Sequence, residues 1–161
     1  MTSKKRVVLI TGAESGIGKS TSKIFLDNGY KVICTYLKNN NNKNTKDIEY
    51  HRIDITKNKD WENLALYIKK KFKKIDVLVN SAGVRLSGNL ETTSMSDWSY
   101  HLNNNVTGTF LACKYILPFL KKAKNSSIIN VASINSIRGV KNMLAYATSK
   151  LSLIHISEPT R

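Results

Sequence analysis

Three residues late in the chain have the types and spacing needed for acid–base chemistry on a carbonyl group. Tyr146 and Lys150 stand four positions apart, and Ser133 precedes them. Side chains four apart share one face of a helix, so a lysine ammonium can lie beside the phenol and stabilise its ionised form. At about 4 Å and an effective dielectric near 20, one ammonium contributes roughly 4 kcal/mol. The spacing therefore indicates proton transfer by a tyrosine near neutral pH.

The spacing alone is a weak signal, because a chain with 7 tyrosines and many lysines produces such a pair by chance. Tyr67 and Lys71 repeat it on a lysine-rich amphipathic segment, with no serine at the end of a strand before them. Ser133, in contrast, ends an apolar run, where open α/β sheets place their ligands. This context favours Tyr146 and Lys150.

A glycine-rich loop near the start of the chain is suited to holding phosphate groups. The loop, residues 11–18, follows an apolar run and opens an amphipathic segment. Its glycines permit a tight turn and close approach to a pyrophosphate, and the helix N-terminus that follows offers free N–H groups. Gly18 precedes Lys19 and Ser20, but no glycine stands five positions before Gly18. This argues against a nucleotide-triphosphate loop.

Alternating apolar and amphipathic segments predict the architecture. Short apolar runs rich in β-branched residues predict strands at 6–11, 31–36, 48–54, 75–80 and 127–132. Helical periodicity predicts helices at 16–28, 60–73 and 96–121, and another that starts near Met143. Ser96 is the candidate N-cap of the third helix, and Ile17, Ile24 and Phe25 are expected to face inward in the first. The alternation predicts a doubly wound parallel α/β sheet of the Rossmann type.

Composition limits the classes of protein that fit. The net charge is +15, but the lysines are spread along the chain, which favours a solvated surface over a nucleic-acid-binding module, the alternative. Cys34 and Cys113 stand alone, so neither a disulfide framework nor a metal site is expected, and a reducing cytoplasmic environment is the simplest. The apolar run 7–10 is too short for a signal peptide or a membrane span.

The C-terminal residues 151–161 resemble the translation of an adapter used in sequencing libraries. We therefore expect them to be an artefactual tail without functional information. The natural domain then occupies residues 1–150 and is incomplete at its C-terminal end. Because later strands would be missing, we expect the chain itself to turn over poorly and its full-length parent to be active.

From Arg6 to Lys150 the chain resembles the single-domain short-chain dehydrogenase/reductase family, because several motifs occur in the family's order. The loop at 11–18 resembles the family's cofactor loop. Residues 80–83 spell Asn-Ser-Ala-Gly, where the family has Asn-Asn-Ala-Gly. Asp54 stands at the position of the family's adenine-binding aspartate.

The resemblance also implies a catalytic set of Asn105, Ser133, Tyr146 and Lys150. Asn105 follows Trp98 by seven positions, as the family's helix asparagine does, although Asn103 and Asn104 compete for this register. Ser133 would hydrogen-bond the substrate carbonyl, and Tyr146 would donate a proton to its oxygen. Lys150 would hold the nicotinamide ribose, while the backbone carbonyl of Asn105 would hold a water that replenishes the proton. The implied cofactor contacts are Thr11, Gly12, Ser15, Gly16, Ile17, Gly18, Tyr36, Lys38, Asp54, Ile55, Asn80, Ala82, Gly83, Tyr146 and Lys150.

The end of the second strand bears on the choice of cofactor. A carboxylate there would bind the ribose 2′-hydroxyl of NAD and repel a phosphate. The strand instead ends Cys34-Thr35-Tyr36, with Lys38 following, which favours NADP and leaves NAD possible. Ser15 weakens the preference, because many NADP-preferring members of the family carry a basic residue at that position.

The resemblance implies a small-molecule ketone or an acyl-carrier-protein-linked substrate. Reduction of 3-oxoacyl groups on the acidic acyl carrier protein is the first expectation, and a basic surface would suit that partner. The alternatives are an NAD-dependent dehydrogenase of a sugar, polyol or steroid alcohol, and a non-catalytic dinucleotide sensor. A sensor would not need Ser133, Tyr146 and Lys150 together. The full-length parent is expected to form a homo-tetramer or homo-dimer.

Overall fold

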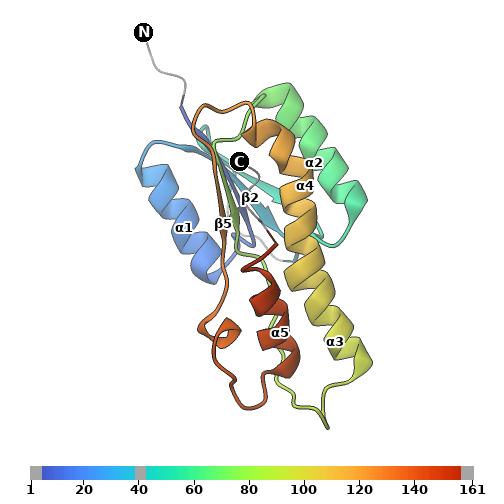
Figure 1. Cartoon of the computed structure of the whole chain (residues 1–161). Helices are drawn as coiled ribbons and strands as arrows, with labels where there is room; N and C mark the ends of the chain where they lie inside the picture. Colours follow the sequence, from blue (N-terminus) through green and yellow to red (C-terminus); the bar gives the residue numbers. More distant parts are fainter. Residues whose placement is uncertain (1–4, 39–42, 157–161) are drawn as a thin grey trace.

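The computed structural model describes residues 5–38 and 43–156, and a parallel five-stranded sheet forms the centre of this part of the chain. The strands are β1 (Val7–Thr11), β2 (Lys31–Tyr36), β3 (Ile48–Arg52), β4 (Val77–Asn80) and β5 (Ser127–Asn130). Their order in the sheet is β3-β2-β1-β4-β5 (Figure 1). The chain switches direction across the sheet between β1 and β4, which is where such folds bind ligands. The predicted doubly wound fold is confirmed.

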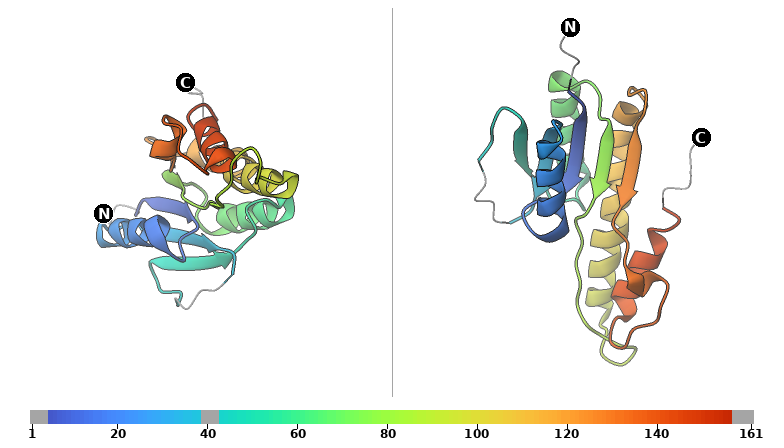
Figure 2. Two further views of the ribbon diagram at one scale, coloured as in Figure 1. Left: turned by 90° about the horizontal axis from the view of Figure 1, so that it is seen from below. Right: turned by 90° about the vertical axis from the view of Figure 1, so that its left-hand side faces the viewer.

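Helices cover both faces of the sheet. Helix α1 (Gly16–Asp27) lies on one face, and α2 (Asn58–Lys71) and α4 (Gly108–Leu120) lie on the other (Figures 1 and 2). On the α2 and α4 side, Trp61, Ile68 and Ile116 have no exposed surface. On the α1 side, Val8 and Ile10 are equally buried. Because β1 is covered on both faces, its apolar run is unbroken.

Helix α1 packs against the sheet through small residues. Gly18 and Ser22 are its buried positions, whereas Ile17 and Ile24 are each 62% exposed. A Cβ atom on Gly18 would overlap the carbonyl oxygen of Gly12. The prediction that Ile17 and Ile24 face inward is therefore wrong, because the start of the helix approaches the glycine loop too closely for large side chains. The prediction for Phe25 is confirmed, since it packs, partly buried, against the core on this face of the sheet.

The helix predicted at 96–121 is one helical stretch with an irregular middle. It comprises α3 (Met95–His101), the π-helical turn η1 (Leu102–Thr107) and α4. The hydroxyl of Ser94 accepts a hydrogen bond from the Asp97 N–H at 3.0 Å, so the N-cap is Ser94 and the prediction of Ser96 is wrong. Ser94 has the extended backbone that a cap requires. Single π-helical turns occur frequently at functional sites.

A second lobe lies beyond the carboxyl ends of the strands (Figure 2). It contains α3, the short 3-10 helix η2 (Ile134–Ser136) and helix α5 (Leu144–Ser152), and η2 packs against α5. The first residues of the predicted tail continue α5, and Leu153 is 4% exposed. Residues 157–161 of the tail lie outside the described residues.

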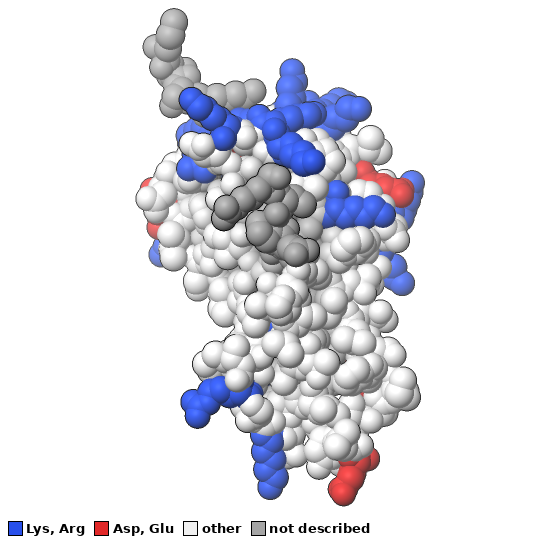
Figure 3. Space-filling view, in the orientation of Figure 1, with Lys and Arg blue, Asp and Glu red and all other residues white. Residues whose placement is uncertain are grey.

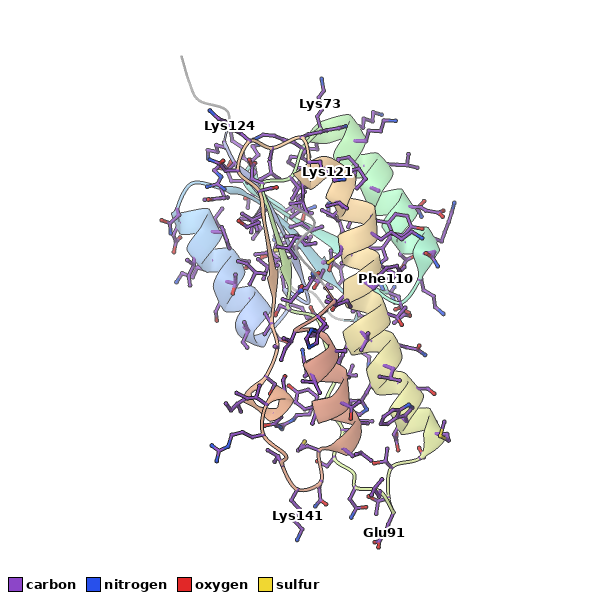
Figure 4. The ribbon with its side chains drawn as sticks, viewed as in Figure 1. Lys73, Glu91, Phe110, Lys121, Lys124 and Lys141 are labelled. Carbon is purple, nitrogen blue, oxygen red and sulfur yellow. The ribbon has the colours of Figure 1, made fainter. Side chains whose placement is uncertain are left out.

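Basic side chains gather at the opposite end of the molecule from this lobe. Figure 3 shows a concentration of lysine and arginine over that end, and Figure 4 places Lys73, Lys121 and Lys124 there, far from Lys141 and Glu91. These lysines follow the C-terminal ends of α2 and α4, where helix dipoles favour positive charge. Among the described residues, no helix is long and apolar enough to cross a membrane.

The burial of α2 predicts how substitutions on it affect stability. Ile68 is fully buried, whereas Leu66 on the same helix is 64% exposed. We expect Ile68→Ala to lower the free energy of unfolding by about 2–5 kcal/mol, because it removes core contacts and leaves a cavity. Leu66→Ala should change it by less than about 0.5 kcal/mol. Urea denaturation followed by circular dichroism measures both, and equal losses would contradict the assignment of the buried face.

Candidate functional site

A cleft of about 540 Å³ lies at the carboxyl edge of the sheet. This volume is typical of a site for a cofactor or small ligand. The glycine loop, the end of β2 and the segment after β4 form its walls. The sequence-predicted residues that line it are Gly12, Ser15, Gly16, Ile17, Tyr36, Lys38, Ile55, Ala82 and Gly83. Those that are not among its lining residues are Thr11, Gly18, Asp54, Asn80, Asn105, Ser133, Tyr146 and Lys150.

The glycine loop brings backbone close to the segment after β4. Gly12 has a φ of 65°, and a Cβ atom there would stand 2.7 Å from the Ala82 Cα. Helix α1 begins directly after Ser15, whose side chain makes no capping hydrogen bond, and its first turn carries no acidic residue. The unused N–H groups and the positive end of the helix dipole therefore face the cleft, as a pyrophosphate requires.

The predicted residues outside the cleft lining support its walls. The Thr11 hydroxyl accepts hydrogen bonds from the Ser81 and Ala82 N–H groups, each at 3.1 Å. The buried Asn80 amide donates to Asn130 Oδ1 at 2.8 Å, which joins β4 to β5. These contacts fix the segment after β4, which lines the cleft.

Asp54 is engaged locally in the structure. Its Oδ1 accepts from the Thr56 N–H at 2.9 Å and from the Thr56 hydroxyl at 2.7 Å. Its own N–H donates to Asp60 Oδ2 at 2.7 Å. The carboxylate therefore shapes the turn between β3 and α2, and its adenine-binding role stays a prediction.

The side chain of Asn105 holds the centre of the site. Asn105 is fully buried in η1. Its Oδ1 accepts from the Val84 N–H at 2.7 Å, and its Nδ2 donates to the Val84 carbonyl at 3.0 Å and to the Ser149 hydroxyl at 2.8 Å. Its backbone carbonyl accepts from the Thr109 hydroxyl at 2.8 Å. The water-binding role of this carbonyl stays a prediction.

The ammonium of Lys150 lies next to the cleft. Lys150 is 5% exposed, and its Nζ donates to the Val131 carbonyl at 2.8 Å. A Cβ atom on Gly83, which lines the cleft, would stand 3.3 Å from this Nζ and 3.0 Å from the Asn105 Oδ1. Asn105 and Lys150 are thus brought together at Gly83. Burial lowers the pKa of the Lys150 ammonium below its ordinary value.

Tyr146 lies on the same helix as this lysine, and Ser133 begins η2, which packs against that helix. Tyr146 is half-buried one turn before Lys150 on α5, and its ring packs edge-on near the ring of His101, with centroids 6.4 Å apart. Ser133 is the N-cap of η2, and its hydroxyl oxygen accepts from the Asn135 N–H at 3.2 Å. This acceptor role leaves the hydroxyl hydrogen able to donate to another group.

The alternative pair, Tyr67 and Lys71, forms a separate structure on α2. Lys71 Nζ donates to the Tyr67 hydroxyl at 2.9 Å and to Glu49 Oε1 at 2.6 Å, and the Tyr67 hydroxyl donates to Glu49 Oε2. None of the three lines the cleft, and neither do Tyr146 and Lys150. The pair Tyr67 and Lys71 ties α2 to the edge strand β3, whereas the Lys150 ammonium lies at Gly83, which lines the cleft.

Sequence reasoning missed several residues of the site, Glu14 and His101 among them. Glu14 lines the cleft beside the end of β2, where its Oε1 accepts from the Leu37 N–H at 3.5 Å. Its Oε2 is buried without a hydrogen-bond partner in the described part of the chain. His101 is 1% exposed and contacts Tyr146. Sequence offered only weak signals for them: a charge inside the glycine loop, and a histidine four residues before Asn105.

Comparisons with known proteins agree with this geometry. The family model described as short chain dehydrogenase matches residues 6–161. The 3-ketodihydrosphingosine reductase of Bacteroides thetaiotaomicron is 31% identical over 153 residues, covering 95% of this chain and 56% of the relative. The 3-oxoacyl-acyl-carrier-protein reductase of Thermotoga maritima is 32% identical over 161 residues, covering 95% of this chain and 65% of the relative.

A solved structure extends the likeness to three dimensions. The structure of ElxO with NADP bound superposes with a TM-score of 0.83 at 31% identity, covering 94% of this chain and 64% of that one. The chain therefore spans between 56% and 65% of the length of these three proteins.

The buried ammonium of Lys150 predicts a pH dependence of stability. Its pKa is lowered in the folded state from the ordinary 10.5, so the folded chain releases this proton first as pH rises. The contribution of Lys150 to the free energy of unfolding should therefore increase as the pH rises from this lowered pKa to about 10.5. Lys150→Met should lose this increase, which urea denaturation between pH 7 and 10.5 measures. Lys71→Met is the control. The pKa of Lys71 is raised by its hydrogen bond to Glu49, so this residue contributes no increase in the free energy of unfolding between pH 7 and 10.5 that the substitution could remove.

Proposed function

Because the chain belongs to the short-chain dehydrogenase family, we propose that it forms the dinucleotide-binding and catalytic part of an oxidoreductase that interconverts a ketone and a secondary alcohol. The observation that carries this proposal is the buried Lys150 ammonium beside Gly83, on the same helix as Tyr146 and at the edge of the cleft. A charged group held next to a cleft at the cost of desolvation is typical of a functional site.

The cleft has the features that a nicotinamide dinucleotide requires. The α1 N-terminus and the glycine loop would hold the pyrophosphate, and the end of β2 would hold the adenosine ribose. Lys150 at Gly83 would hold the nicotinamide ribose hydroxyls. A bound nicotinamide would supply the hydride for ketone reduction.

The residues of this chain would move the proton. Ser133 would orient the substrate carbonyl through its hydroxyl hydrogen, and Tyr146 would donate the proton to the carbonyl oxygen. Lys150 would favour the ionised product form of the phenol through its positive charge. The backbone carbonyl of Asn105 would hold a water from which the proton is restored.

The end of β2 supports binding of both dinucleotides, with NADP(H) preferred. Lys38 lines the cleft there and is exposed, so its ammonium can pair with a 2′-phosphate. Glu14 lies at the same place, and its carboxylate would accept from the 2′-hydroxyl of NAD and repel the phosphate of NADP. ElxO, a structural relative of this chain, has NADP bound, which supports the preference.

For the substrate, we propose a 3-oxoacyl group on acyl carrier protein. This rests on the similarity to the Thermotoga maritima reductase, of which the chain covers 65%. The basic surface does not further support an acyl-carrier-protein substrate, because Lys73, Lys121 and Lys124 lie at the end of the molecule away from α5 (Figure 4).

Since the chain is shorter than its relatives, we propose that the 161 residues bind cofactor and turn over slowly, and that the parent reading frame carries full activity.

Two substitutions at the end of β2 test the choice of cofactor. Lys38→Glu should weaken NADPH binding about tenfold and change NADH binding about twofold or less, because only NADPH loses a charge-assisted contact. Glu14→Gln should strengthen NADPH binding, because it removes a repelling carboxylate. Titration of nicotinamide fluorescence with the 161-residue chain measures both affinities without turnover. Equal effects on the two dinucleotides would contradict the assignment.

Substitution of the proposed acid tests the reaction. Tyr146→Phe should lower kcat for NADPH-dependent reduction of a 3-oxoacyl thioester by about 10²- to 10⁴-fold, because it removes the proton donor. Tyr67→Phe is the matched control, since Tyr67 has the same spacing to a lysine but lies on α2, where its hydroxyl bonds Glu49 and Lys71. NADPH oxidation by the parent protein should be unchanged in that control. Unchanged turnover in Tyr146→Phe would remove Tyr146 from the mechanism.

A further inference from the structure

His101 is a buried side chain that joins two parts of the site. It lies on α3, is 1% exposed, and uses both ring nitrogens. Its Nε2 accepts from the Leu86 N–H at 2.9 Å, and its Nδ1 lies 2.7 Å from the Asp97 carbonyl oxygen. The first contact joins the ring to the segment after β4, and the second holds the ring against its own helix, α3.

These two contacts define the protonation state of the ring. A backbone N–H can only donate, so the Nε2 that meets Leu86 must be an unprotonated acceptor. A carbonyl oxygen can only accept, so the Nδ1 that meets Asp97 must carry the hydrogen. The ring is therefore the neutral Nδ1–H tautomer, and each nitrogen has a single partner that fits it.

His101 and Asn105 act on neighbouring positions of the same segment. Asn105 holds the N–H and carbonyl of Val84, and His101 holds the N–H of Leu86. This segment, residues 84–86, continues directly from Gly83, where the Lys150 ammonium lies. Val84 itself lines the cleft. The helical stretch from α3 to η1 thus fixes one wall of the cleft through two side chains.

The ring of His101 also reaches the proposed acid. Its centroid lies 6.4 Å from that of the Tyr146 ring, with an interplanar angle of 69°. This edge-to-face geometry lies within the range favoured for aromatic pairs. Helices α3 and α5 are in contact, so the ring lies between the wall at 84–86 and the tyrosine.

We propose that His101 is a positioning residue that couples the segment 84–86 to the ring of Tyr146. Its role in turnover rests on the function proposed above, whereas its structural coupling can be measured without turnover. The neutral ring holds the cleft wall through Leu86 and limits the orientations of the Tyr146 ring through its edge-to-face contact. The phenol then meets the substrate carbonyl in one geometry.

Two substitutions separate the hydrogen bond from simple packing. His101→Leu fills a similar volume but cannot accept from Leu86, whereas His101→Gln keeps an acceptor oxygen that can reach the same N–H. In His101→Leu we expect exchange of the Leu86 amide hydrogen to accelerate about tenfold relative to that of Val84, as for loss of one buried hydrogen bond. We also expect the Tyr146 ring resonances to shift. His101→Gln should restore most of the Leu86 protection.

Kinetics of the parent protein give the second measurement. His101→Leu should lower kcat about tenfold while the affinity for NADPH changes about twofold or less, because an interaction that positions the acid is lost and the cofactor contacts stay. His101→Gln should recover part of kcat. The matched control is His51→Leu, because His51 on β3 also packs against a tyrosine, Tyr67, with centroids 4.6 Å apart, but lies outside the cleft. It should change neither Leu86 exchange nor kcat.

The proposal is overturned if His101→Leu leaves Leu86 exchange within about twofold of wild type relative to Val84. It is equally overturned if exchange at both amides accelerates together, which would indicate general destabilisation, or if the glutamine variant loses as much protection as the leucine variant. Absence of ketone reduction by the wild-type parent would defeat the proposed function alone. In that case, Leu86 exchange and the Tyr146 resonances still decide whether the coupling exists.

Discussion

One buried amide, that of Asn105, joins the separate parts of the site. It connects Val84, which follows β4, to Ser149 on α5, and it does so from the π-helical turn η1. These segments are far apart in sequence, and leaving one partner of a buried amide unsatisfied costs about 1–3 kcal/mol. Lys150 follows Ser149 directly, so the place of its ammonium depends on this amide. The cleft wall, the lysine helix and the central helix are therefore positioned as one unit.

Burial of the Lys150 ammonium is unfavourable by itself, and the stability of the remainder of the fold must offset its cost. Lys150 keeps its positive charge out of water with a single backbone carbonyl, that of Val131, as its hydrogen-bond partner among the described residues. Desolvation of an ammonium is costly, and one neutral partner offsets it only in part. The same end of the sheet has the positive pole of α1 and Lys38. Together they would attract an anionic ligand, with Glu14 as the opposing charge.

Local patterns in the sequence were enough to predict the sheet and much of the site. The β-branched apolar runs identify the strands, of which β1 and β4 are buried throughout, and the glycine loop lies where β1 passes into α1. Asn105 and Lys150 meet at Gly83, so the structure brings together motifs that are separated in sequence. These features depend on short stretches of chain, in which residue type and spacing determine backbone conformation.

Features that depend on contacts between distant segments could not be predicted in this way. Glu14 reaches the end of β2 from the glycine loop, and His101 meets Leu86 and Tyr146 only after α3 and α5 have packed. The exposed Ile17 shows the same limit, because helical periodicity gives the apolar positions but not how closely the helix approaches its neighbour. Asp54 differs again, since its carboxylate bonds two residues ahead to Thr56, a pattern that shapes turns.

The π-helical turn η1 makes the length of this helix as important as its composition. In an α-helix each residue turns the chain by about 100°. The i→i+5 hydrogen bonds of a π-helical turn accommodate one extra residue, so loss of one residue from Leu102–Thr107 would let it relax to ordinary α-helix and would leave α3 and α4 in nearly the same relative orientation. The side chain of Asn105, which lies inside the turn, would shift relative to Val84 and Ser149, its hydrogen-bond partners. A single-codon deletion here would disturb the site more than most substitutions, although the helix itself would survive.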